Sequence, residues 1–328
     1  MEEKTYGKKI IKLRGIFEEA GKVALLTHKQ PDGDALGSTL ALKFYLENQG
    51  KRVKVFYSGE MEENLSYLPG FDEDYFYEEG YEIKENFDLA VICDAGETRR
   101  VGISIRNLDP KSRKLVFIDH HTNKTREECL LEIARRDSAA TSMIVYDYFL
   151  MNRIDFSRNI ATCLLTGIFT DTGGFKHANT DSRVMQAASE LMRRGACLSL
   201  IAKKNFSNKK INTLKVWGRA LERAKLNNRS KMAFSYITQN DLKECGASIE
   251  DLSGVTNILG SAEESVYSLF LAETENHRLK GSLRSEEYKN CDVSEIAKML
   301  GGGGHKLASG FELEGKIKKD KDKGTEVA

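Results

Sequence analysis

The sequence lacks the cysteine spacing of a zinc site or of a small disulfide scaffold. It has six cysteines, and no two of them form a CxxC pair, whereas both kinds of site need closely spaced cysteines. Cys93 and Cys163 lie within apolar runs and are expected to be buried thiols. No run is apolar enough to span a membrane, and the charged start, MEEKTYGKKIIKLRGIF, lacks the apolar core of a signal peptide. We therefore expect a reducing, cytoplasmic setting without membrane contact.

An excess of charge of one sign is also absent. The 50 Lys and Arg residues nearly balance the 49 Asp and Glu residues, for a net charge of +1. No overall field therefore attracts nucleic acid, and an anionic ligand must be held by a local cluster of side chains. We expect no stable complex with long nucleic acids. The chain has no internal repeat, and its 328 residues suit two domains.

What the first half does contain is a series of short apolar segments that end in acidic residues or histidine. Helical spacing over residues 35–49 separates the first two segments, and this alternation predicts an α/β domain with a doubly wound, mostly parallel sheet. In chain order the predicted strands are residues 23–28, 52–57, 89–94 and 114–121. A fourth acidic segment, GIFTDTGGF from Gly167, follows a predicted helix over residues 158–169.

The polar residues at these ends have the chemistry of a divalent-metal site. Carboxylates and imidazoles without thiolates favour manganese or magnesium over structural zinc. Because the carboxyl ends of parallel strands share one edge of a sheet, we expect these side chains to converge there. One ion would be held by His28, Asp32 and Asp94. A second would be held by Asp34, Asp94, His120 and Asp171, so that Asp94 bridges the two.

Each acidic residue also has a simpler explanation. Asp34 could cap the helix that follows it, with Asp32 as a turn residue, and Asp94 could pair with a nearby arginine. Asp171 could lie in a helix C-terminal turn, although acidic residues are disfavoured near that negative end. Neighbouring carboxylates repel each other strongly unless a cation lies between them, and the metal site explains all of them at once.

The triplet Asp119-His120-His121 is the most specific signal, since packing rarely requires three consecutive titratable residues. Side chains alternate along a strand, so Asp119 and His121 share one face and His120 takes the other. We expect His120 to be a direct ligand, His121 to face the substrate or the leaving group, and Asp119 to orient an imidazole. Two ions about 3.5–4 Å apart can activate a bridging water and stabilise both the attacking and the leaving oxygen.

The second half predicts a smaller α/β domain. Strands are expected at residues 231–237, 265–273 and 277–285, and a helix at 292–300 precedes GGGGH. The glycine run can expose backbone N–H groups to a phosphate, with His305 as a further donor, and Arg284 can bind the same group bidentately. A flexible turn and a solvated arginine are the alternative explanations. The expected organisation is a catalytic domain (1–205), a linker helix (206–228), a substrate-binding domain (229–316) and a disordered tail (317–328).

Taken in order, the segments HxxPDGDAxGS, VxxD, DHH and TDTGxF resemble the DHH phosphoesterase superfamily, and KGSLRS with GGGGHKLASG resembles its DHH-associated C-terminal domain. The resemblance is strongest to the bacterial nanoRNase and pAp-phosphatase family. It implies two manganese ions, with magnesium or cobalt as substitutes, on the ligands given above. It implies catalytic roles for Asp94, Asp119 and His121. It also implies substrate binding by a set of C-terminal residues: Arg284, Ser285, Gly302, Gly303, Gly304 and His305.

The activity that this resemblance implies is hydrolysis of RNA from dinucleotides to about pentamers, releasing 5′-mononucleotides, and conversion of pAp to AMP. Turnover of cyclic di-AMP or pApA is the first alternative. A pyrophosphatase or exopolyphosphatase shares the N-terminal segments but not SLRS and GGGGH. A non-catalytic RNA-binding protein is the alternative from another class. KKNFSNKK (203–210) fits either a solvated hinge or a contact for a short oligonucleotide, and the sequence is compatible with a monomer or a homodimer.

Overall fold

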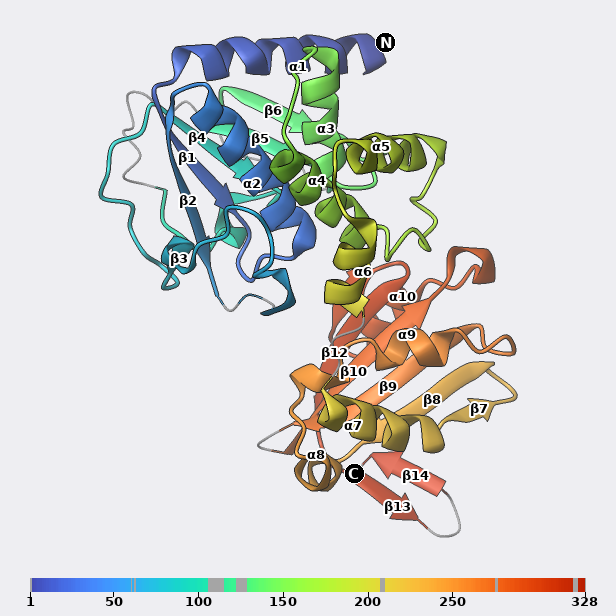
Figure 1. Ribbon diagram of the computed structural model, residues 1–328. Helices are drawn as coiled ribbons and strands as arrows, with labels where there is room; N and C mark the ends of the chain where they lie inside the picture. The colour runs from blue at the N-terminus through green and yellow to red at the C-terminus, as the bar shows by residue number, and fades with distance from the viewer. Residues whose placement is uncertain are drawn as a thin grey trace. The chain divides into compact units, whose positions relative to one another are not determined.

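The computed structural model divides the chain into two compact units, Met1–Asn208 and Lys209–Ala328, each built around its own sheet (Figure 1). The residues described are 2–59, 61, 63–105, 115–121, 129–206, 210–274, 277–320 and 324–327. Part of the KKNFSNKK segment, residues 207–209, lies outside them. Among the described residues, no helix combines the length and apolar character needed to cross a bilayer.

The first unit contains a six-stranded sheet in which every neighbouring pair is parallel, as the sequence predicts. Its strands are β1 (Lys22–Thr27), β2 (Arg52–Ser58), β3 (Phe76–Tyr77), β4 (Leu89–Cys93), β5 (Leu115–Asp119) and β6 (Leu131–Ala134). The strand order is β3-β2-β1-β4-β5-β6. The order reverses between β1 and β4, and ligands of open α/β sheets bind at such a reversal, beyond the carboxyl ends of the strands.

Helices cover one face of this sheet (Figure 1). They are α1 (Glu2–Glu19), α2 (Gly33–Asn48), α3 (Thr141–Met151), α4 (Arg158–Asp171), α5 (Ser182–Arg193) and α6 (Leu198–Phe206). Alternate strand residues such as Leu25, Val91 and Ile118 enter the core under these helices. Their neighbours, such as Ile92 and Phe117, form a second core against residues of the 81–105 segment. The period of two along each strand thus fills both faces with apolar side chains, which leaves the strand ends for polar residues.

Helices α2 and α4 lie in close contact at Gly37. A Cβ atom at this position would lie 2.4 Å from the carbonyl oxygen of Cys163 and 3.1 Å from the amide nitrogen of Gly167. Because both contacts are backbone atoms, they cannot move away by changing a rotamer. Replacing Gly37 by alanine is expected to lower the free energy of unfolding by roughly 1–3 kcal/mol, the usual cost of overpacking. Urea denaturation of the purified variant measures this loss.

Gly15→Ala is the matched control for that substitution. A Cβ at Gly15, in α1, would have nothing within 4 Å. There the better helix propensity of alanine should raise the free energy of unfolding by up to about 1 kcal/mol. Equal stability of the Gly37→Ala variant and the wild type would show that the two helices can separate at no cost.

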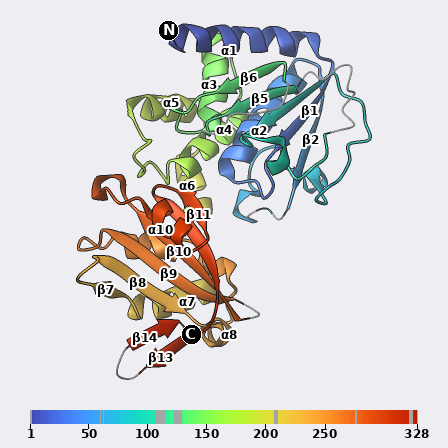
Figure 2. The ribbon, with the colours of Figure 1, turned by 180° about the vertical axis from the view of Figure 1, so that it is seen from behind.

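The second unit has a mixed sheet in the order β11-β12-β10-β9-β8-β7 (Figure 2). Only β8 and β9 pair in parallel within it. Its strands are β7 (Lys225–Asn227), β8 (Met232–Ile237), β9 (Tyr267–Thr274), β10 (Arg278–Ser285), β11 (Gly303–His305) and β12 (Ala308–Glu314). Its helices are α7 (Ile211–Glu222), α8 (Gln239–Cys245), α9 (Val255–Gly260) and α10 (Val293–Met299). A smaller C-terminal α/β unit is what the sequence predicts.

Two parts of the expected domain organisation differ in the structure. The helix expected within the linker is α7, and its Val216 and Ala220 are buried in the core of the second unit with Phe270. Its apolar face packs on the second sheet, so it belongs to that unit. The tail expected to be disordered contains β13 (Ile317–Asp320) paired antiparallel with β14 (Gly324–Val327). A charged composition does not prevent such pairing, because the backbone N–H and C=O groups of the two segments satisfy each other.

Candidate active site

The turn after β1 brings His28 and Asp32 together at the first residues of α2. Asp32 is the N-cap of α2, where its Oδ1 accepts hydrogen bonds from the amides of Asp34 and Ala35, each at 3.0 Å. Its Oδ2 lies 3.8 Å from Nε2 of His28. One oxygen therefore caps the helix while the other faces the imidazole. The simpler explanation that made Asp34 the cap is wrong, since Asp34 lies inside the helix.

Asp34 lies in the first turn of α2 and is fully buried against the start of α3. Its Oδ2 accepts a 2.6 Å hydrogen bond from the amide of Thr141, and its Oδ1 accepts a 2.8 Å hydrogen bond from the amide of Ser142. Burial, and then the charge of Asp94, raises the pKa of Asp34 well above its usual value. The first amides of a helix are a favourable place for a carboxylate, but they do not offset this burial. A cation beside Asp34 would offset the cost of burying its charged form.

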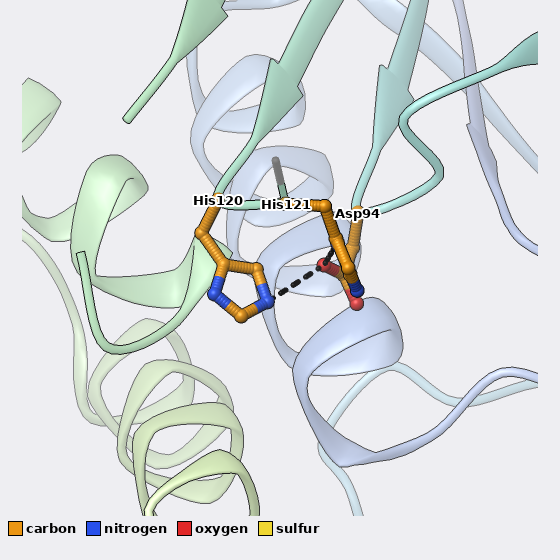
Figure 3. A group of neighbouring side chains, drawn as sticks. All are labelled: Asp94, His120 and His121. Atoms are coloured by element: carbon orange, nitrogen blue, oxygen red, sulfur yellow. Dashed lines mark ion pairs between the residues drawn. The ribbon is translucent and has the colours of Figure 1, made fainter. Parts of the chain in front are cut away.

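Asp94 is the centre of the site. It follows β4 with φ of 58°, and its amide donates to the carbonyl of Ile118 at 2.9 Å, which fixes it beside the end of β5. Its carboxylate Oδ2 lies 3.6 Å from Nε2 of His28. Oδ1 lies 3.4 Å from Nε2 of His120 and 3.4 Å from Nδ1 of His121 (Figure 3). Burial alone would raise the pKa of Asp94, but hydrogen bonding to His121 and His28 holds it below its usual value.

The two histidines after β5 reach Asp94 from different directions (Figure 3). Nδ1 of His121 is 2.8 Å from Oδ1 of Asp119, the last residue of β5. His120 turns the other way, with its Nε2 3.1 Å from Oδ2 of Asp171. Hydrogen bonds to Asp119 and Asp94 raise the pKa of His121 to about 10, whereas burial lowers the pKa of His120. The alternation expected for the triplet is thus present.

Asp171 closes the cluster from the end of α4. It is the last residue of that helix, where the helix dipole is negative. Burial, followed by the charges of Asp34 and Asp94, raises the pKa of Asp171 well above its usual value. Its close partner is the imidazole of His120, whose pKa is lowered by burial, so the location supports a cation rather than a structural ion pair.

The donor atoms form three overlapping groups whose members lie within 4.8 Å of one another. They are His28 with Asp32 and Asp94, Asp34 with His120 and Asp171, and Asp94 with His120 and His121. Within the described ranges, no lysine or arginine forms an ion pair with any of these carboxylates. Oδ2 of Asp119 is buried and has no hydrogen-bond partner among the described residues. Hard oxygen donors, imidazoles and uncompensated negative charge fit two divalent cations.

A separate pocket of about 590 Å³ lies in the second unit. It is lined by β10, including Lys280, Ser282 and Arg284, by the glycine run that leads into β11, and by part of β12, including Glu312. The Arg284 guanidinium is partly buried and donates to the carbonyl of its neighbour Leu283 at 2.9 Å. No carboxylate in the described residues forms an ion pair with it. A partly buried, unpaired guanidinium facing a pocket is suited to an anionic ligand.

The expected substrate-binding residues divide between this pocket and its surroundings. Gly302, Gly303 and Gly304 line it, and a Cβ at Gly302 would lie 2.1 Å from the carbonyl oxygen of Gly310, so only glycine fits there. Ser285 does not line the pocket, because it follows Arg284 on the opposite side of the strand and its hydroxyl donates to the carbonyl of Val266. His305 is exposed at the end of β11 and also lies outside the lining.

The sequence reasoning missed two contributors. The first contributor is the pair of amides of Thr141 and Ser142, which bind Asp34. Because β6 was not predicted, the sequence did not indicate that the start of α3 lies at the edge of the sheet. A signal was present in the run of small residues, SAATS, ahead of an apolar helix. Lys280 lines the C-terminal pocket. Its spacing of four residues from Arg284 on one strand is the pattern that places both side chains on the same face.

Comparison with known proteins agrees with this geometry. Residues 22–168 match the DHH family, N-terminal domain, and residues 215–324 match the DHHA1 domain. The bifunctional oligoribonuclease and PAP phosphatase NrnA of Thermus thermophilus is 30% identical, over 90% of this chain and 85% of its own length. The chain belongs to the DHH family. The Bacillus subtilis protein of the same name is 28% identical over 89% of both chains.

Solved structures of DHH proteins share the fold. An exopolyphosphatase-related protein from Bacteroides fragilis superposes with a TM-score of 0.82 at 26% identity, covering 94% of this chain and 92% of that one. RecJ from Thermus thermophilus, solved in complex with Mn²⁺, has a TM-score of 0.53 at 13% identity over 94% of this chain and 52% of its own. As a member of this family, the chain is a hydrolase of phosphate esters. DHH enzymes use divalent metals, and the cluster around Asp94 offers groups that could bind them.

Proposed function

We propose that this hydrolase acts on short RNA, from dinucleotides to about pentamers, releasing 5′-mononucleotides, and that it converts pAp to AMP. The observation that carries the proposal is the cluster of overlapping donor groups around Asp94 and His120 at the strand-order reversal. Relatives named as oligoribonuclease and PAP phosphatase along nearly the whole chain support this substrate class. The proposed cofactor is a pair of divalent ions, with manganese as the metal and magnesium or cobalt as substitutes.

The proposed ligands combine the overlapping donor groups of the cluster, in which Nε2 of His120 lies 3.4 Å from Asp94 and 3.1 Å from Asp171. His28, Asp32 and Asp94 would hold one ion, while Asp34, Asp94, His120 and Asp171 would hold the other. When bound, such ions neutralise charge on the phosphoryl oxygens and lower the pKa of a water molecule. The protein contributes rigidity, because most of these carboxylates are fixed by a capping interaction, a backbone amide or an imidazole. That rigidity places the phosphate ester without reorganisation at the moment of reaction.

His121 is the proposed general acid. Its Nδ1 is held at 2.8 Å by Oδ1 of Asp119, which leaves Nε2 to transfer a proton to the leaving oxygen. Asp119 is buried and has the orienting role, since it fixes the tautomer and the ring plane of the imidazole. Asp94 contacts both histidines and is the residue common to both ion sites, so the proposal gives it the central catalytic role.

The C-terminal pocket is the proposed holder of a substrate phosphate. Arg284 supplies the charge, and the backbone of Gly302–Gly304 supplies a surface without side chains. Ser285 and His305 follow the lining residues Arg284 and Gly304 in the chain, and we propose that they contact the substrate at the border of this pocket. An anchor for one phosphate favours substrates of a few nucleotides over long strands, whose many phosphates would need an extended basic surface.

Replacing Arg284 by alanine is expected to raise KM for a dinucleotide and for pAp roughly ten- to hundredfold, because hydrogen bonds to charged groups contribute about 1.5–3 kcal/mol. The value of kcat should change little. Arg284→Lys should restore only part of the loss, since an ammonium group cannot bind two oxygens in the same plane. Steady-state kinetics with both substrates measures these effects.

Arg229→Ala is the matched control. Arg229 is an exposed arginine in the turn between β7 and β8 of the same sheet, and it does not line the pocket. Its loss should leave KM unchanged. An Arg284→Ala enzyme with the wild-type KM for both substrates would remove the pocket from the proposal.

A substrate panel with Mn²⁺ tests the proposed activity against its alternatives. It contains 5′-labelled RNA of two to five nucleotides, a long RNA, pAp, cyclic di-AMP, pApA and pyrophosphate. We expect the dinucleotide and pAp to be hydrolysed fastest. A preference for cyclic di-AMP or pApA would identify a phosphodiesterase of second-messenger turnover instead. Faster turnover of pyrophosphate would identify a pyrophosphatase, and RNA binding without any metal-dependent turnover would identify a binding protein.

A further inference from the structure

The segment Ser138–Ser142, at the start of α3, bonds three of the four residues proposed above for one of the two ions and is linked to the fourth through Asn179. Backbone amides at its end donate to Asp34, and the hydroxyl of Thr141 donates to Asp94. His120 hydrogen bonds to the backbone of Ser138. Asp171 is reached through Asn179, whose Nδ2 lies 3.3 Å from its carbonyl oxygen and 3.1 Å from the carbonyl oxygen of Ala139. One short segment thus joins groups that come from α2, β4, β5 and α4.

Within this segment, Thr141 bonds two of the carboxylates directly. Its amide donates to Oδ2 of Asp34 at 2.6 Å, and its Oγ1 donates to Oδ1 of Asp94 at 2.9 Å. The side chain has no solvent exposure. Any residue would supply the amide, but the second bond needs a hydroxyl. Only threonine and serine supply a hydroxyl in the space available at this helix start.

The Asp94 bond matters because the carboxylates repel each other. Asp94 and Asp34 are both buried, and no lysine or arginine among the described residues forms an ion pair with either of them. The hydroxyl of Thr141 donates to Oδ1 of Asp94, the oxygen that also lies 3.4 Å from His120 and from His121. Because the amides of Thr141 and Ser142 bind Asp34, this hydroxyl ties the Asp94 carboxylate to the segment that holds Asp34 and so fixes the two carboxylates relative to each other.

We propose that Thr141 is a positioning residue that holds Asp94 and Asp34 in the orientation needed to share a divalent ion. The inference rests on the proposed ligand assignment, and it adds a residue that touches neither substrate nor ion. Its hydroxyl acts as an outer partner of a metal ligand, and loss of such a partner typically lowers metal affinity roughly 10- to 100-fold.

Isothermal titration of Mn²⁺ into the metal-free full-length protein tests the role, with the thermal midpoint of the metal-free protein as a second readout. Thr141→Val is expected to lower Mn²⁺ affinity roughly 10- to 100-fold. Thr141→Ser should bind Mn²⁺ close to the wild-type affinity because it keeps the hydroxyl. Thr141→Ala, which places no methyl group against the buried carboxylate, should show the same loss as valine and covers the case in which the valine variant does not fold.

Thr162→Val is the matched control. Thr162 is also buried, but its hydroxyl donates to the carbonyl of Arg158 within its own helix. It should keep the wild-type Mn²⁺ affinity. Wild-type affinity in both Thr141→Val and Thr141→Ala, or an equal loss in Thr162→Val, would overturn the positioning role and leave the proposed activity intact. Failure of the wild type to bind Mn²⁺ would instead overturn the ligand assignment and this inference with it.

Discussion

Replacing Asp94 by asparagine is expected to reduce hydrolysis of a dinucleotide by about a thousandfold or more. The carboxylate lies 3.4–3.6 Å from three imidazoles and belongs to both groups proposed to bind ions. Asparagine keeps the size but replaces one oxygen by an NH₂ group, which cannot bind a cation. Metal ions contribute several kcal/mol of charge stabilisation in the transition state, and each 1.36 kcal/mol corresponds to a tenfold change in rate.

Asp88→Asn is the matched control, because Asp88 and Asp94 lie at opposite ends of β4. Asp88 precedes the strand and accepts hydrogen bonds from the amides of Gly21 and Lys22, far from the carboxyl edge of the sheet. Its substitution should leave kcat unchanged. Metal content measured by mass spectrometry should fall in the Asp94 variant alone. An Asp94→Asn protein with wild-type turnover and wild-type metal content would contradict the assignment.

Removing the metal ions is the change with the second largest expected effect. Chelation should abolish hydrolysis and lower the thermal midpoint at neutral pH. A ligand present at a hundred times its Kd stabilises the folded state by about 2.7 kcal/mol, which corresponds to roughly 5–10 °C for a unit of this size. Differential scanning fluorimetry with and without Mn²⁺ measures the shift, and activity should return when Mn²⁺ is restored.

The thermal shift on metal removal should also widen as pH rises from about 6.5 to 9. In the metal-free protein, burial alone would lower the pKa of His28, but hydrogen bonds to Asp32 and Asp94 raise it to about 10. Hydrogen bonds to Asp119 and Asp94 likewise raise the pKa of His121 to about 10. When folding raises the pKa of a histidine, the histidine stabilises the folded state below the pKa it has in the unfolded chain. This stabilisation is lost as pH rises toward about 10. The raised pKa values of Asp34 and Asp171 also make the metal-free protein less stable as pH rises.

The metal-loaded protein should not share the part of this loss that comes from His28, because an imidazole that binds a metal ion does so in its neutral form. The two midpoints should therefore separate with rising pH. His277→Gln, which lies in the second unit, serves as the control and should leave the separation unchanged. A constant difference between the two midpoints across this pH range would show that the histidines are not paired with the carboxylates of the cluster in solution.

Much of the fold and of the cluster could be predicted from the sequence because each strand end carries its own local signal. His28, Asp94 and His120 follow apolar segments short enough to be strands, and parallel strands bring their carboxyl ends to one edge. The alternation of Asp119, His120 and His121 follows from the period of two along a strand. The meeting of these residues therefore needed only local pattern and sheet geometry.

What could not be predicted depends on contacts between segments far apart in the chain. The bond from Thr141 to Asp94 joins residues on different elements, and it requires β6, a strand of only four residues, to be in place first. Which aspartate caps α2 depends on one φ/ψ choice, and the structure gives that role to Asp32. The second unit shows the same limit, because the side of β10 that lines the pocket depends on how β10 pairs with β12, which the sequence alone does not reveal.

The most direct test of the account is the release of 5′-mononucleotide from a 5′-labelled RNA dinucleotide, measured for the wild type with Mn²⁺, after chelation, and for Asp94→Asn with Mn²⁺. The account predicts rapid release by the wild type with Mn²⁺ and almost none in the other two conditions. Equal release in all three would show that hydrolysis does not depend on the cluster around Asp94. No release by the Mn²⁺-loaded wild type would contradict the proposed action on short RNA.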